Sequence, residues 1–331
     1  MLNRLLKLNP KIFDADVVKE TIRKGFGEGL VKAGEQDERV VALCADLTES
    51  VQMEAFKKKF PERFFEVGVA EQNLAIVASG MAAAGKISFM GSYAIFNPGR
   101  NWEHIRTTIC YNNRPVKIVG SHGGLSVGPD GGSHQMLEDI SLTRVLPRMV
   151  VISPCDSIEA RKATIAMAKT NTPVYIRLSR DKTPIVTTEE TSFEIGKAQV
   201  LFEPIAGKPD VGIIATGSLV FEALLAAKEL EKEKIAVTVL NLSTIKPLDE
   251  KAIIRLAEDA RAIVTVEDHQ VAGGMGGAVA ELLAKIKPTP IEFVGINDRF
   301  GQSGTPEELK NLYGLSSTHI QVAAKKAIKR K

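Results

Sequence analysis

Short apolar runs alternate along the first half of the chain with longer segments that carry apolar residues at helical spacing. The runs lie at residues 40–45, 87–91, 115–120, 149–153 and 174–178. Apolar runs without polar alternation are typical of parallel strands that are buried on both faces. The segments before and between them predict helices over residues 15–34, 71–84, 100–111 and 156–169. This alternation predicts an α/β fold with a doubly wound, mostly parallel sheet.

The periodicity lapses between Asp181 and about Gly207, where Thr, Glu, Pro and Gly are prominent. We expect the linker between two domains there. A second α/β series follows, with strands expected over 211–215, 236–240, 262–266 and 291–294 and helices over 219–230, 249–259, 276–286 and 306–313. At 331 residues the chain is long enough for two such domains. We therefore expect a first domain over residues 1–190 and a second, smaller α/β domain over 191–331.

One stretch interrupts the apolar pattern with a carboxylate. Residues 64–67 predict a short buried strand, Gly68 a turn, and Glu71 the first turn of a helix. The helix is rich in Ala, Gly and Ser, so another backbone can pack closely against it. Two interpretations of Glu71 stay open. It favours the positive end of the helix dipole, or it is buried beside a ligand and exchanges a proton with it.

A glycine-rich loop, residues 121–135, follows the predicted strand at 115–120. It holds His122 and His134, on either side of Asp130. Glycines let the backbone approach a ligand, and histidine can donate to hydroxyl or phosphate oxygens near neutral pH. The alternative is a surface loop that holds two histidines by chance. The loop lacks the spacing of a dinucleotide site or a P-loop, which disfavours a nicotinamide- or ATP-dependent enzyme.

Further polar residues lie at the ends of predicted elements. They are Arg23, Ser50, Ser179 and Arg180. Taken singly, each is more often a solvated surface residue. Together they could converge on one anionic group, because the guanidinium fork pairs well with phosphate.

Aromatic residues make up only 5% of the chain, yet Phe89, Tyr93 and Phe96 lie within eight positions of one another. Core packing is the default explanation for them. The alternative is a flat heteroaromatic ligand that stacks on one of these rings.

Composition narrows the classes of protein to consider. The net charge of +3 gives no argument for nucleic acid or a membrane surface as a partner. Cys44, Cys110 and Cys155 are far apart and fit neither a disulfide framework nor a CxxC site. The first residues hold too short an apolar run for a signal peptide, and no later run approaches a membrane span. We expect a cytoplasmic protein that binds neither nucleic acid nor a membrane.

Four segments together resemble the pyrimidine-binding domain of transketolase: Asp46–Ser50, Phe65–Gln72, Asp130–Gln135 and Leu178–Arg180. Two later segments, Glu267–Gly277 and Arg299–Gly304, are similar to the C-terminal domain of the same family. The resemblance runs in the right order over nearly the whole chain. It implies a thiamine-diphosphate pyrimidine-binding domain over 1–190 and a transketolase C-terminal domain over 191–331, as in the separate C-terminal subunit of a split transketolase.

The resemblance implies that the chain binds the pyrimidine half of thiamine diphosphate. Glu71 matches the glutamate that hydrogen-bonds N1′ of the aminopyrimidine, where a shared proton favours the imino tautomer that deprotonates thiazolium C2. A carboxylate with this task should be shielded from water, which the closely packed helix allows. Tyr93 and Phe96 match the aromatic pocket around the ring, and Asp46 matches a carboxylate near the cofactor. We add Phe89, from the predicted strand that precedes them, to the expected cofactor contacts.

The same resemblance implies a sugar-phosphate site. His122 and His134 match histidines that contact the hydroxyl and phosphate ends of the sugar, so we expect them to act in catalysis with Glu71. Asp130 matches the carboxylate that reads a substrate hydroxyl. The expected phosphate-binding set is Arg23, Ser50 and Arg180, with Ser179 beside them.

One motif of the family is missing. Transketolases bind the cofactor diphosphate through a metal-binding GDG motif and a later asparagine, and this chain has no such motif. Asp130–Gly131 lies in the histidine loop and has no suitable asparagine after it. We therefore expect no metal site here, and a partner N-terminal subunit that holds the diphosphate with Mg²⁺ or Ca²⁺. The expected assembly is an α₂β₂ heterotetramer with sites at subunit interfaces.

The implied function is transfer of a two-carbon ketol unit between ketose and aldose sugar phosphates, in the pentose phosphate pathway and only with the partner subunit. A fragment of 1-deoxyxylulose-5-phosphate synthase is one alternative, although that pattern carries arginine where this chain has His122. The beta subunit of a 2-oxo acid dehydrogenase is another, although it would not need the sugar-phosphate residues. A catalytically silent subunit is the third, and an intact Glu71 argues against it.

Overall fold

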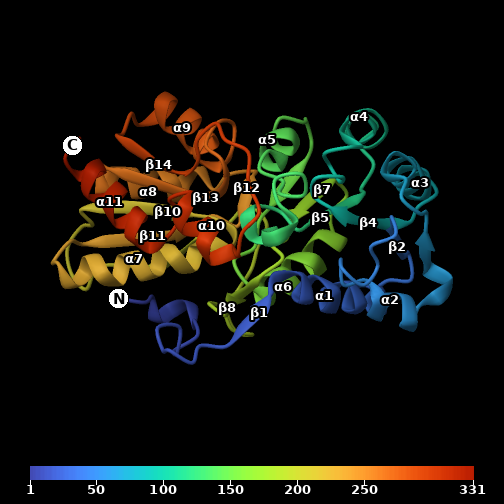
Figure 1. Ribbon diagram of the computed structural model, residues 1–331, viewed down its shortest axis with the longest axis horizontal. Coiled ribbons are helices and arrows are strands. Elements are labelled where there is room, and N and C mark those ends of the chain that lie inside the picture. Colours follow the sequence, from blue (N-terminus) through green and yellow to red (C-terminus); the bar gives the residue numbers. More distant parts are fainter.

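Seven strands form the sheet of the N-terminal half, in the order β12-β6-β7-β5-β4-β2-β3. Six of them run parallel: β2 (Val40–Cys44), β3 (Phe64–Glu66), β4 (Ile87–Tyr93), β5 (Lys117–Ser121), β6 (Val150–Ile152) and β7 (Val174–Arg177). The seventh, β12 (Thr244–Lys246), comes from the C-terminal half and pairs antiparallel with β6. The computed structural model describes residues 1–331, and Figure 1 shows the two halves of the chain at opposite ends of an elongated molecule.

Helices cover both faces of this sheet, which confirms the doubly wound prediction. α1 (Ile22–Gln36) and α6 (Ser157–Ala168) pack on one face, and α3 (Glu71–Ala83) packs on the other with the π-helix η3 (Ile105–Tyr111). Every residue of β2 is buried, and alternate residues belong to the cores on opposite faces. A parallel strand covered on both sides needs this continuous apolar run. Shorter helices complete this half: α2 (Glu54–Lys59), η2 (Pro61–Arg63), α4 (Trp102–His104), η4 (Leu125–Asp130) and α5 (Asp139–Arg144).

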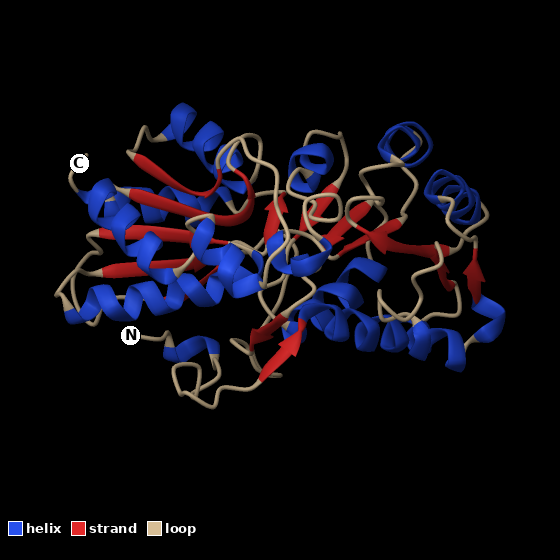
Figure 2. Cartoon of the chain, viewed as in Figure 1, coloured by secondary structure: helices blue, strands red, loops and turns tan.

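The C-terminal half has a five-stranded sheet of its own, in the order β14-β13-β10-β11-β9. Four strands are parallel and the edge strand β9 is antiparallel; they are β10 (Val211–Ala215), β11 (Val237–Asn241), β13 (Ile263–Gln270), β14 (Ile291–Ile296) and β9 (Gln199–Phe202). Its helices are η5 (Gly217–Leu219), α7 (Val220–Lys232), α8 (Glu250–Ala260), α9 (Met275–Ile286), α10 (Pro306–Leu312) and α11 (Ser317–Ile328). Figure 2 shows helices on both sides of the strands here too, so a second, smaller α/β domain is confirmed.

The first residues of the chain cross between the two halves. A backbone bridge joins Leu2 to Phe202 of β9, just before η1 (Arg4–Leu6). Farther on, β1 (Lys19–Thr21) pairs antiparallel with β8 (Lys182–Pro184) in a small separate sheet. The predicted linker over 181–207 therefore contains two strands, β8 and β9.

Three predicted elements differ from the structure. The helix expected from residue 15 begins only at Ile22, because the preceding residues pair with β8. The strand expected to be buried over 64–67 is the edge strand β3, where Phe65 and Glu66 are exposed. The helix expected over 100–111 is a single α-turn followed by the π-helix η3.

A buried ion pair of the first half also forms a hydrogen bond to the C-terminal half. The Arg177 guanidinium lies 2.9 Å from the carboxylate of Asp139, which also accepts a hydrogen bond from the Tyr175 hydroxyl at 2.6 Å. Arg177 also donates to the backbone oxygen of Asp268 at 2.8 Å. Arg177 and Asp139 are almost fully shielded from water, so this network fixes the C-terminal half against the edge of the first domain.

No helix of the protein is both long enough and apolar enough to cross a membrane.

Candidate active site

Glu71 is the first residue of α3, and its side chain is only 2% exposed. One carboxylate oxygen, Oε2, accepts a hydrogen bond from the Arg100 guanidinium at 2.9 Å. The other, Oε1, lies 3.5 Å from Ser92 Oγ. Attraction to the helix dipole does not by itself require the carboxylate to leave water. The burial therefore favours the interpretation of Glu71 as part of a shielded site.

Four rings form a continuous group beside this carboxylate. Tyr93, at the end of β4, stacks on His122 with ring centroids 3.8 Å apart and lies parallel to Phe96 at 6.4 Å. Phe96 meets His134 edge-on at 5.8 Å. The Arg100 guanidinium lies 5.0 Å from the centroid of Phe96. Because the same guanidinium binds the carboxylate, the rings and the carboxylate belong to one site.

His122 directly follows β5 and has a backbone φ of 59°. Few non-glycine residues adopt this left-handed conformation, and such strain often occurs at functional sites. Its Nδ1 lies 2.9 Å from Ser121 Oγ. Burial lowers the pKa of His122 to about 3, and the positive charges of Arg23 and Arg180 act in the same direction. The imidazole is therefore neutral at physiological pH, with one nitrogen free to bind a ligand.

The predicted phosphate-binding residues surround the same histidine. Arg23 of α1 donates to the backbone oxygen of Ser50 at 2.5 Å. Arg180, beyond the end of β7, lies 3.6 Å from the Asp130 carboxylate. Both arginines are close enough to His122 to lower its pKa. The structure thus brings together residues from four separate segments, with two guanidinium groups at one end of the site.

Asp46 follows β2 and has a left-handed φ of 59°. The carboxylate of Glu66 holds this turn, because it accepts hydrogen bonds from the backbone N–H of Asp46 at 2.7 Å and of Gly68 at 3.2 Å. The Asp46 residue is exposed. Its expected contact with the cofactor stays a prediction.

Phe89 does not lie in the site. Its side chain is fully buried in the middle of β4, in the same core as Phe26 and Val119. Core packing explains this residue, so the structure gives no support to the prediction that Phe89 contacts the cofactor.

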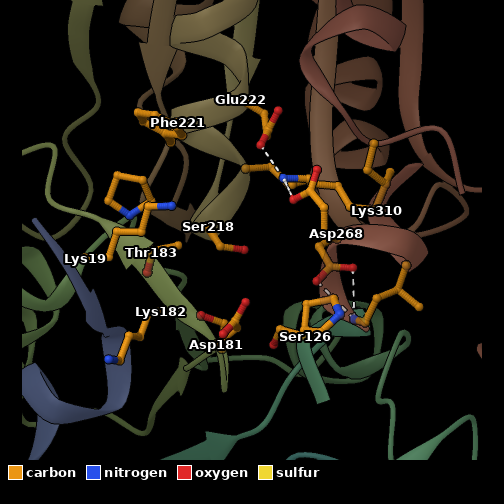
Figure 3. A pocket seen from close by; sticks show the side chains of 17 residues that line it. Lys19, Ser126, Asp181, Lys182, Thr183, Ser218, Phe221, Glu222, Asp268 and Lys310 are labelled. Carbon is orange, nitrogen blue, oxygen red and sulfur yellow. Dashed lines mark hydrogen bonds and ion pairs between the residues drawn. The ribbon is translucent and has the colours of Figure 1, made fainter. Parts of the chain in front are cut away.

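Ser179 lines a cavity to which neither histidine contributes. Its hydroxyl is buried and has no hydrogen-bond partner, and the cavity, of about 180 Å³, lies between the two halves of the chain. Figure 3 shows this cavity, with Asp181 and Ser126 on one side and the Glu222–Lys310 ion pair on another. The structure therefore gives no support to Ser179 as a direct substrate contact.

Sequence reasoning missed three residues that surround Glu71. Arg100 and Ser92 face its carboxylate, and Asn101 donates to its backbone oxygen at 3.0 Å. The one available signal was the position of Arg100, four residues after Phe96, which places both on one side of a helical turn. The contact with Glu71 spans 29 residues of sequence and left no local signal.

Two family models match the chain. The model of the transketolase pyrimidine binding domain matches residues 19–186, and the model of the transketolase C-terminal domain matches residues 196–320. The chain belongs to the transketolase family. The order of the two domains is the one that the resemblance implied.

The transketolase relatives include proteins that this chain covers almost completely. A Methanocaldococcus jannaschii protein described as a transketolase C-terminal section is 45% identical over 92% of this chain and 95% of its own. A Clostridium protein named 6-deoxy-6-sulfo-D-fructose transketolase subunit is 39% identical over 96% of this chain and 98% of its own. A solved structure, described as a split gene transketolase in an inactive beta4 tetramer, has a TM-score of 0.86 and 42% identity, over 93% of this chain and 98% of that one.

The transketolase family implies thiamine diphosphate, and the residues around Glu71 fit its pyrimidine half. A flat heteroaromatic ring needs aromatic neighbours and a hydrogen-bonding partner at its edge. Tyr93 and Phe96 supply half-buried aromatic surface, and Glu71 supplies a shielded acceptor. No group of three or more His, Cys, Asp and Glu side chains is arranged in this chain to hold a metal ion.

Proposed function

We propose that this chain is the C-terminal subunit of a two-chain transketolase that moves a two-carbon ketol unit from a ketose phosphate to an aldose phosphate. The observation that carries the proposal is the shielded Glu71 carboxylate next to a ring group that continues, through His122, to two arginines. When bound, thiamine diphosphate supplies the electron sink for cleavage of the carbon–carbon bond. The chain's own residues hold, orient and exchange protons around it.

Glu71 holds a proton at the edge of the pyrimidine ring in this proposal. Its burial keeps water from competing for that proton. Tyr93 and Phe96 orient the ring. The neutral imidazole of His122 donates to or accepts from a substrate hydroxyl, because its low pKa leaves one nitrogen without a proton. His134 contributes a second imidazole, 5.8 Å from the ring of Phe96.

The sugar phosphate binds at the other end of the site. Arg23 and Arg180 lie close enough to His122, and to each other, for their charges to act on it and on one another. Bidentate pairing with phosphate oxygens suits arginine better than any other side chain. Asp130, next to Arg180, accepts a hydrogen bond from a hydroxyl of the sugar chain.

A partner N-terminal subunit completes the enzyme in this proposal, in an α₂β₂ assembly in the cytoplasm. The partner holds the cofactor diphosphate with Mg²⁺ or Ca²⁺, while residues 1–190 bind the pyrimidine half and residues 191–331 form the C-terminal domain. Apolar side chains flank Glu71 without cover, with Val69 69% and Ile76 47% exposed, and a partner would bury them. The beta4 tetramer of the solved relative is described as inactive, which supports a need for a second kind of chain.

Reconstitution tests this function. The chain is mixed with the N-terminal subunit from the same genome, thiamine diphosphate and Mg²⁺, and ketol transfer between sugar phosphates is measured. We expect activity only in the complete mixture. Glu71→Gln should lower turnover by a factor of about 10² or more without loss of assembly, because general acid–base catalysis contributes that much.

Glu54→Gln is the matched control, since Glu54 also opens a helix but has a side chain that is 42% exposed and pairs only with Lys58. Its activity should equal that of the wild type. A fully active Glu71→Gln enzyme would exclude the proposed role of Glu71. Use of pyruvate as donor, with no ketol transfer, would overturn the transketolase assignment.

A further inference from the structure

Arg100 forms an ion pair with Glu71, the carboxylate that the proposed chemistry requires. Its guanidinium donates to Oε2 of Glu71 at 2.9 Å. The remaining oxygen, Oε1, faces Ser92 Oγ at 3.5 Å, which is long for a hydrogen bond between hydroxyl and carboxylate. Each carboxylate oxygen can accept more than one hydrogen bond, so space, and not the number of lone pairs, decides whether a second ligand fits. The guanidinium on Oε2 also lies over the ring of Phe96, so a ligand ring that stacks on Phe96 and binds Glu71 meets Arg100.

The free subunit has a physical reason to keep this ion pair. A carboxylate as buried as that of Glu71 is strongly destabilising when it has no partner. Arg100 supplies the partner from a fixed position, because its backbone N–H donates to the Phe96 carbonyl at 3.0 Å and its guanidinium lies over the Phe96 ring. The pair thus stabilises Glu71 while no ligand is bound.

The two partners differ in how easily they can separate. The side chain of Arg100 is 43% exposed, whereas that of Glu71 is 2% exposed. Arg100 can therefore turn into solvent and keep its charge hydrated, while Glu71 cannot leave the site. Phe96, over which the guanidinium lies, is one of the two rings expected beside the pyrimidine. The ligand and Arg100 consequently compete for the same carboxylate and the same aromatic surface.

We propose that Arg100 is a positioning residue that takes the place of the aminopyrimidine ring on Glu71 and gives up Oε2 when the cofactor binds. This inference rests on the proposed function. It assigns Arg100 two effects of opposite sign. The guanidinium stabilises the subunit without cofactor, and it weakens cofactor binding because the ion pair must first break.

The test compares thiamine diphosphate binding by assembled enzymes in isothermal titration calorimetry. Arg100→Gln should lower the cofactor dissociation constant by about two- to fivefold, the range expected for loss of a partly exposed ion pair. The free Arg100→Gln subunit should melt about 2 to 4 °C lower than wild type. Arg100→Lys should resemble wild type, because it keeps a cation beside Glu71. Arg106→Gln is the matched control, since Arg106 is an exposed arginine in η3 without an ion-pair partner.

The dependence on Glu71 separates displacement from a general effect on the fold. In a Glu71→Gln background, Arg100→Gln should change the melting temperature and the dissociation constant much less than it does in the wild-type background, because only the contact with the Phe96 ring is then lost. This double variant also keeps the test possible if Arg100→Gln alone does not fold, because a neutral side chain at position 71 no longer needs the guanidinium. Unchanged or weaker cofactor binding by Arg100→Gln overturns the displacement. Absence of cofactor binding by the wild-type assembly overturns the proposed function as well.

Discussion

Replacing Arg180 by alanine should weaken recognition of the substrate phosphate and leave recognition of the sugar chain nearly unchanged. Arg180 is 38% exposed, lies 3.6 Å from Asp130 and donates to the carbonyl of Val127. These two contacts hold the guanidinium in place but use only part of its five N–H groups. The unused groups are available to a phosphate oxygen.

The size of the effect follows from this geometry. A hydrogen bond to a charged group contributes about 1.5–3 kcal/mol, and partial exposure reduces that value. Arg23, whose charge acts on both His122 and Arg180, would keep part of the phosphate interaction. We therefore expect a loss of about 1–2 kcal/mol, or roughly 5- to 30-fold in kcat/KM for a phosphorylated acceptor. The loss should appear mainly in KM, because the phosphate does not take part in bond cleavage.

The assay compares one aldose phosphate with the same aldose without its phosphate, in the reconstituted enzyme. Loss of the contact with Val127 disturbs the 125–130 segment for both acceptors alike, so the ratio of the two kcat/KM values isolates the phosphate interaction. Arg180→Lys should recover part of the loss as a point charge. An equal loss with both acceptors, or no loss with either, would refute the assignment of Arg180 to the phosphate.

Three further substitutions test the structure around the site. His122→Asn keeps a residue type that tolerates a φ of 59° and removes a group whose pKa is about 3 in the fold against 6.5 ordinarily. Because only the unfolded chain takes up this proton as the pH falls below 6.5, wild type should lose more stability than the variant between pH 6.5 and 4 in urea titrations. Gly124→Ala would place a Cβ 1.9 Å from the carboxylate of Asp268 at a φ of 80°, so a large fall in melting temperature is expected. Arg177→Met should cost about 3–5 kcal/mol of unfolding free energy because it leaves the buried Asp139 unpaired, and a loss below about 1 kcal/mol would contradict the network.

The sequence predicts the central strands of this protein better than its edges. β2 is a continuous apolar run because both of its faces are covered. β3 begins with two phenylalanines but lies at the edge of the sheet, so the exposure of Phe65 depends on strand order and not on local pattern. The same limit applies to α1, whose late start results from pairing between β1 and β8, about 160 residues apart.

Phe89 and Tyr93 show why site residues are harder to predict than strands. Both lie on β4 four residues apart, so the alternation of the strand places them on the same side of the sheet. Phe89 is in the middle of the strand and packs in the core, whereas Tyr93 is its last residue and stacks on His122. The position of each residue along the strand decides whether it packs in the core or reaches the site. The pattern of residue types does not reveal where the strand ends, so it cannot separate the two. The ion pair between Glu71 and Arg100 is likewise a tertiary contact without a local signal.

Strand order explains how one site acquires a cofactor end and a phosphate end. In the sheet order β7-β5-β4-β2-β3, the residues at or just beyond the carboxyl ends are Arg180, His122, Tyr93, Asp46 and Glu71. Parallel sheets bind ligands at this edge. Four strand spacings of about 4.8 Å give a length of about 19 Å, which is longer than a pyrimidine ring and leaves room for a second ligand. Substitutions near β7 should therefore change the KM for sugar phosphates, whereas substitutions near β3 should change cofactor affinity. The order of the strands in space differs from their order along the chain, so the site brings together Glu71 and Arg180, which are 109 positions apart in the sequence.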